Sequence, residues 1–121
     1  MKAARYLCCV LLGLSGLGHL YGTFLFYTPG TDTFVWSLSA SAFVGAVITF
    51  NLFALSGRTS HLLAAGIASL LWAGHALAFG QSVGDMADPR VLAHAISAAA
   101  LAAINVMALA RTDRAVVSPA I

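Results

Sequence analysis

The stretch TFVWSLSASAFVGAVITFNLFALSG, residues 33–57, contains no charged side chain. It is longer than the roughly 20 residues that an α-helix needs to cross about 30 Å of hydrocarbon. Three more stretches, residues 6–28, 61–83 and 91–110, are also free of charge apart from their histidines. We therefore predict an all-α integral membrane protein with four transmembrane helices in one membrane domain over residues 1–121. The expected spans are residues 6–28, 33–56, 60–80 and 89–110.

The composition supports a lipid environment. Hydrophobic residues make up 60% of the chain, charged residues only 8%, and the mean hydropathy is +0.91. An ordinary soluble domain carries about a quarter charged residues, and one this short hides only about two-thirds of its surface. The basic start followed by an apolar run also resembles a cleavable signal peptide. The run continues through Tyr27 without a small-x-small cleavage site, so we expect an uncleaved first span.

The basic residues are unevenly distributed between the two ends of the predicted bundle. The positive-inside rule therefore places both termini in the cytoplasm, N-in and C-in. All connections are short, which predicts an up-down-up-down bundle. Five basic residues fall on the cytoplasmic side and one, Arg90, on the other; the five are Lys2, Arg5, Arg58, Arg111 and Arg114.

Local signals place three helix boundaries. Asp88-Pro89 combines an N-capping residue with proline at the first helical position, which predicts the start of the fourth helix. Gly57 is expected to end the second helix, and Thr59 or Ser60 to cap the third.

Three histidines share one depth in the predicted outer leaflet. His19, His75 and His94 lie on three different helices, and Trp72 precedes His75 by three residues. Ionisable residues within spans usually face the bundle interior and carry function. We expect the three imidazoles to converge in one pocket, where at least two bind haem b or a copper or zinc ion, with Trp72 as part of the cofactor-binding wall. In the alternative, each imidazole only donates a hydrogen bond to a carbonyl or serine of the next helix.

A second polar layer lies in the predicted inner leaflet. Asn51 and Asn105 are expected to hydrogen-bond to each other between helices. His61 begins the third span and should lie at the wet interface. All three are interpreted as structural polar residues.

Small residues occur at four-residue spacing along the first span, as in Gly18-x-x-x-Gly22. Such rows let helix backbones approach closely in a membrane. We interpret the row as packing within the bundle, with a homodimer interface as the alternative.

The layout resembles the DoxX-like group of small four-helix membrane proteins. The shared features are a glycine-rich first span, a short Pro-Gly outer loop and an Ala73-Gly74-His75 segment ending the third span; the glycines are Gly13, Gly16 and Gly18. The resemblance implies association with membrane redox systems near quinones. We therefore expect the protein to lie in a bacterial inner (plasma) membrane.

Three functions remain open. The first is a redox-associated protein that binds haem or metal, and the second is a non-catalytic accessory or scaffold subunit in a homo-oligomer or larger membrane complex. A small-solute carrier or channel is third, because no charge lies within the spans. The chain is not expected to be an enzyme on its own, and a net charge of +2 spread over turns does not suit nucleic-acid binding. The carboxylates lie only in loops or the tail, at Asp32, Asp85, Asp88 and Asp113.

Overall fold

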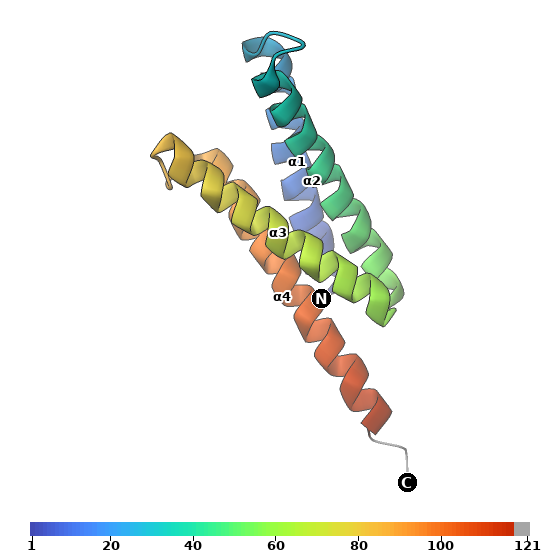
Figure 1. The fold of residues 1–121 in the computed structure, drawn as a ribbon. Coiled ribbons are helices and arrows are strands. Elements are labelled where there is room, and N and C mark those ends of the chain that lie inside the picture. Colours follow the sequence, from blue (N-terminus) through green and yellow to red (C-terminus); the bar gives the residue numbers. More distant parts are fainter. Residues whose placement is uncertain (118–121) are drawn as a thin grey trace.

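The computed structural model describes the backbone of residues 1–117 and the side chains of residues 1–112, so the side chains of Asp113 and Arg114 lie outside it. Within residues 1–117 all regular structure is helical (Figure 1). The elements are α1 (Lys2–Phe26), α2 (Asp32–Phe53), the short 3-10 helix η1 (Ala54–Ser56), α3 (Thr59–Val83) and α4 (Pro89–Val117).

Four segments of this structure are long and apolar enough to cross a membrane. They are Lys2–Phe26, Asp32–Ser56, Thr59–Val83 and Pro89–Thr112. Large apolar side chains such as Leu17 and Trp36 point away from the bundle. The expectation of four apolar helices is thus confirmed, and this exposed surface suits lipid.

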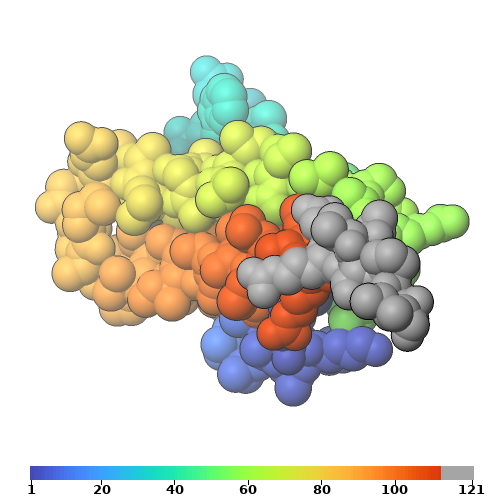
Figure 2. All heavy atoms as spheres, turned by 90° about the horizontal axis from the view of Figure 1, so that it is seen from below, coloured from blue at the N-terminus to red at the C-terminus, as the bar shows by residue number. Residues whose placement is uncertain are grey.

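The helices form two antiparallel hairpins, α1 with α2 and α3 with α4. The α3–α4 pair is the most extensively packed, and α1 also contacts α4 while α2 contacts α3. The hairpins diverge toward the loops that follow α1 and α3 (Figure 1). Seen from the opposite end, α3 runs beside α4, and the start of α1 lies against the other side of α4 (Figure 2).

The predicted boundary signals hold at two of three positions. Asp88 Oδ1 accepts a hydrogen bond from the Arg90 backbone N–H over 2.8 Å, as an N-cap should, and Gly57 follows η1 with φ 72°. The prediction that Thr59 or Ser60 caps α3 is wrong. Gly57 turns the chain so sharply that Arg58 already holds the N-cap position, without a side-chain cap bond.

The interior is built on close helix contacts at particular glycines. A Cβ on Gly16 would lie 2.8 Å from Val44 Cγ1, and one on Gly80 would lie 2.9 Å from Val91 Cγ1. Glycine is therefore needed where α1 meets α2 and where α3 meets α4.

Gly18 and Gly22 behave differently. A Cβ on Gly18 would meet nothing within 4 Å, and one on Gly22 would meet only Phe26 of its own helix. The interpretation of Gly18-x-x-x-Gly22 as packing within the bundle is therefore wrong. This face of α1 points away from the other helices, because the buried face of α1 runs through Leu12, Gly16 and Thr23 instead.

Candidate functional site

The outer polar layer brings together side chains of α1, α3 and α4. His94 is buried on α4, and the half-buried His19 on α1 meets it edge to face, with ring centroids 6.5 Å apart. Trp72 of α3 lies edge-on to His94, with centroids 5.4 Å apart. Two of the three predicted histidines thus form a pair across the two hairpins.

Both ring nitrogens of His94 have partners. Trp72 Nε1 lies 3.3 Å from His94 Nδ1, and an indole N–H can only donate, so Nδ1 accepts. The proton of the neutral ring is then on Nε2, which donates to Ser15 Oγ over 3.0 Å. His94 consequently has no spare lone pair in this arrangement.

The orientation of His19 is fixed by a short relay of hydroxyls. Thr23 Oγ1 donates to the His19 carbonyl oxygen over 2.9 Å, so it must accept from Ser37 Oγ, 2.6 Å away. Ser37 in turn accepts from His19 Nε2 over 3.0 Å. These hydrogen bonds link α1 to α2. Because Nε2 donates, Nδ1 is the unprotonated nitrogen of a neutral His19.

His75 does not join this pair. It is exposed on α3 and stacks on Trp72, with centroids 5.0 Å apart and an interplanar angle of 20°. Among the residues that the structure describes, no three His, Cys, Asp or Glu side chains could hold a metal ion together. The expected pocket of three converging histidines is therefore not formed.

A cofactor would have to compete with these hydrogen bonds. A neutral imidazole binds a metal through its unprotonated nitrogen, and on His94 that nitrogen already accepts from Trp72. The Nε2 atoms of both histidines donate to serines. The arrangement as it stands suits structural polar pairing better than ligation.

The inner polar layer links all four helices. Asn105 Nδ2 donates to Asn51 Oδ1 over 2.9 Å, the pair expected from their shared depth. Asn51 Nδ2 donates to Ser69 Oγ over 2.9 Å, and Arg5 donates to Asn105 Oδ1 over 2.9 Å. Each of these four side chains comes from a different helix. Such a network fixes the register of the bundle, because each bond joins two helices.

Arg5 is the least expected member of this layer. Its positive charge was interpreted only as a topological signal, yet the residue is 4% exposed. Its second bond, 3.4 Å to the Asn51 carbonyl oxygen, again uses an uncharged acceptor. The described carboxylates all lie at the opposite end of the bundle. A guanidinium that is buried beside neutral partners is costly and marks a site of interest.

His61 lies at the end of α3 nearest this layer, outside the network. Its Nδ1 is 3.2 Å from the Phe53 carbonyl oxygen and 2.8 Å from Ser56 Oγ. The imidazole thus provides a hydrogen-bond partner for a carbonyl group at the end of α2, where carbonyls have no partner within the helix. This geometry agrees with the structural role expected for His61.

The residues that sequence analysis missed are Arg5, Ser15, Thr23, Ser37 and Ser69. In the structure Arg5 lies on the buried face of α1 with Cys9, Leu12 and Gly16, at four- and three-residue steps. Sequence did not single out this face, because apolar residues surround the whole helix. No family model, curated protein or solved structure matches this chain, so its function is argued from the two polar layers and the surface.

Proposed function

We propose that this chain is a non-catalytic accessory subunit of the membrane, which associates with a transmembrane helix of a partner through the Gly18–Gly22 face of α1. The observation that carries the proposal is the outward direction of this glycine pair. Glycines spaced in this way let two helices approach closely, which is the main source of helix association in lipid. Within the bundle the pair has no such use.

The interior supports the same proposal. Every buried side-chain nitrogen or oxygen that the structure describes has a hydrogen-bond partner within the chain. The buried amide and hydroxyl groups of both polar layers therefore need no ligand as a hydrogen-bond partner. Only 22% of the most apolar part of α1 is buried, the same share as for α2 and less than the 50% for α4, so the α1–α2 hairpin has surface for a further helix.

Matched glycine substitutions test the proposal. Gly18→Leu should keep the fold, since the site is open, but should reduce crosslinked complexes in membranes and shift the detergent-solubilised protein toward the monomer. Gly74→Leu is the control, because Gly74 is equally open but lies on α3. Circular dichroism checks that both variants stay helical. A wild-type chain that is monomeric, with no partner crosslinked in its membrane, contradicts the proposal.

A second candidate is the binding of haem b or a metal ion by His19 and His94. The favouring observation is that two helices from different hairpins bring these rings together, with centroids 6.5 Å apart. The resemblance to DoxX-like proteins implies association with membrane redox systems, and a site of this kind would fit such an association. Ligation requires His94 to give up its bond from Trp72.

Absorption spectra of the purified protein, oxidised and reduced, together with metal analysis, test this second candidate. If it holds, His94→Ala loses the Soret band or the metal, whereas His61→Ala keeps it. Protein that contains neither haem nor stoichiometric metal contradicts it and leaves the accessory subunit as the proposal.

A further inference from the structure

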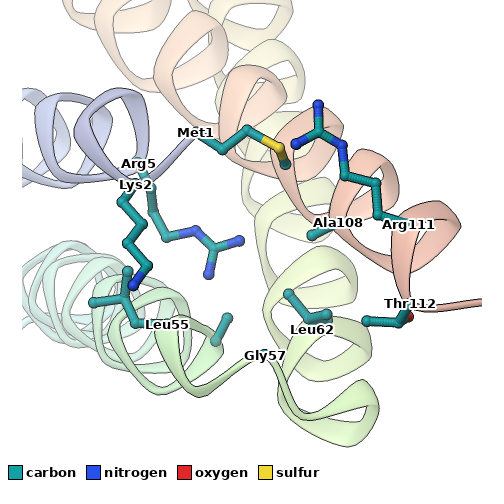
Figure 3. Close-up of a pocket in the computed structure, with 10 residues that line it drawn as sticks. Met1, Lys2, Arg5, Leu55, Gly57, Leu62, Ala108, Arg111 and Thr112 are labelled. Carbon is teal, nitrogen blue, oxygen red and sulfur yellow. The ribbon is translucent and has the colours of Figure 1, made fainter. Parts of the chain in front are cut away.

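A cavity of about 210 Å³ opens at the end of the bundle where α1 begins and α4 ends. Lys2 and Arg5 reach it from α1, and Arg111 comes from α4 on the other side (Figure 3). Apolar side chains supply most of the remaining wall, among them Leu55, Leu62 and Ala108. The cavity therefore combines a cationic rim with an apolar lining.

The charge of this cavity is not balanced by the described residues. Arg5 hydrogen-bonds only to uncharged oxygens, those of Asn51 and Asn105. The guanidinium has five N–H donors, and these two bonds use two of them. The single salt bridge among the described residues, between Asp88 and Arg90, lies at the far end of the bundle. Three positive charges around one cavity create a strong potential for an anion.

The level of the cavity along the bundle axis indicates which class of anion it can bind. Its cationic residues sit at the limits of the apolar spans, which begin at Lys2 and end at Thr112. The turn at Gly57, between two further spans, also lines it. This is the level of the phospholipid headgroups. Basic pockets between helix ends bind anionic headgroups, and the apolar wall suits the glycerol and upper acyl region of a lipid.

We propose that this cavity binds the phosphate group of an anionic phospholipid, with Lys2, Arg5 and Arg111 around the phosphate and Leu62 and Ala108 against the apolar part. Arg5 is held in place by the inner polar layer, so its charge is already oriented before the lipid arrives. The bound lipid would join the start of α1 to the end of α4. The inference is independent of the proposed accessory function.

The test uses the full chain, freed of lipid in a neutral detergent and titrated with short-chain phosphatidylglycerol, phosphatidylcholine or inorganic phosphate. Native mass spectrometry counts the bound lipid, and thermal unfolding measures the stabilisation. Phosphatidylglycerol should bind and raise the melting temperature, whereas phosphatidylcholine should not. Lys2→Gln and Arg111→Gln should each weaken binding about fivefold. Both side chains are exposed, so the folding of these variants is not at risk.

Arg58→Gln is the matched control, because Arg58 is an exposed cation at the same end of the bundle that does not line the cavity. It should leave binding unchanged, while Ala108→Phe, which fills the cavity without changing charge, should weaken it. Equal losses for Arg58→Gln and Arg111→Gln would overturn the proposal in favour of unspecific surface attraction. Equal binding of the two lipids also overturns it. Stabilisation by inorganic phosphate but not by phosphatidylglycerol keeps the phosphate site and overturns its assignment to a lipid.

Discussion

The side chain of Asn105 makes three hydrogen bonds in the inner polar layer. Its amide nitrogen donates to Asn51 Oδ1 and to the Leu101 carbonyl oxygen, and its amide oxygen accepts from Arg5. Truncating such a residue leaves a buried guanidinium and a buried amide short of partners. The cost of unpaired groups, rather than the average strength of a hydrogen bond, therefore sets the effect of a mutation here.

Asn105→Ala should lower the free energy of unfolding by about 2 kcal/mol, because the unpaired Arg5 adds to the lost bonds. The measurement is reversible unfolding in mixed detergent and denaturing surfactant micelles. Val106→Ala, at the neighbouring position with its side chain 58% exposed, is the control and should change stability much less. Equal losses of stability in the two variants would show that breaking the hydrogen-bond network of Asn105 does not destabilise the protein.

Trp72→Phe should lower the free energy of unfolding by about 1 kcal/mol, since it removes the one hydrogen bond that His94 Nδ1 accepts among the described residues while keeping an aromatic ring. Trp36→Phe is the matched control, because Trp36 is 75% exposed on the lipid-facing surface. Nitrogen NMR of labelled histidine should also show the proton of His94 on Nε2 in the wild type. A proton on Nδ1 would contradict the assigned tautomer.

At the scale of the elements, α3 and α4 approach each other closely at Gly80. Gly80 of α3 meets Val91 of α4, which is 1% exposed and too stiff at its branched Cβ to move aside. The contact lies near the outer loop between these helices. Its geometry explains why the two helices can pack along most of their length.

Gly80→Ala should destabilise the protein by about 1–3 kcal/mol through overpacking, because the added methyl group would lie 2.9 Å from Val91 Cγ1. Gly74→Ala, on the same helix in open space, should not destabilise it and should raise helix propensity instead. Unfolding of both variants in the same micelles gives the comparison. If Gly80→Ala left the stability unchanged, α3 and α4 would be able to move apart enough to accommodate the methyl group at little cost.

The start of α4 should make stability depend on pH. The side chain and backbone N–H of Arg90 donate hydrogen bonds to Asp88 and lower the pKa of its carboxyl from 3.8 to about 2. The ionised form is thus favoured in the folded protein. Its contribution is complete above the ordinary pKa of an aspartate and is lost as the pH falls toward 2.

Asp88→Asn should therefore flatten the fall in stability between pH 4 and pH 2, as measured by thermal unfolding across that range. Asp32→Asn, at the start of α2, is the control and should leave most of the slope in place. An unchanged slope in Asp88→Asn would show that this carboxyl does not couple to folding.

At the scale of the whole molecule, the distribution of charge predicts the orientation in the membrane. The end of the bundle with the cationic cavity also holds Arg58, whereas Arg90 at the other end is paired with Asp88. The positive-inside rule predicts that the cavity lies in the cytoplasmic leaflet. Reporter fusions after Tyr27 and Gly80 should be active outside the cell, and one in the Arg58 turn only inside. The reverse pattern would move the cavity to the outer leaflet.

The sequence by itself determined the elements of this protein. Charge-free stretches of membrane length predict four helices, and Asp88-Pro89 and Gly57 predict where two of them begin or end, because these signals act between residues close together in the chain. The depth of each polar residue also followed from the sequence, since it depends only on the rise along a helix. Depth was enough to pair Asn51 with Asn105.

Rotation of each helix about its axis was decided by the tertiary structure alone. It turned His75 outward while His19 and His94 met, it turned Gly18 away from the bundle, and it directed Arg5 inward. In a chain this apolar, the pattern of hydrophobic residues hardly distinguishes one face of a helix from another. Close packing and the need to pair buried polar groups choose the face, and both depend on neighbours that are distant in the sequence.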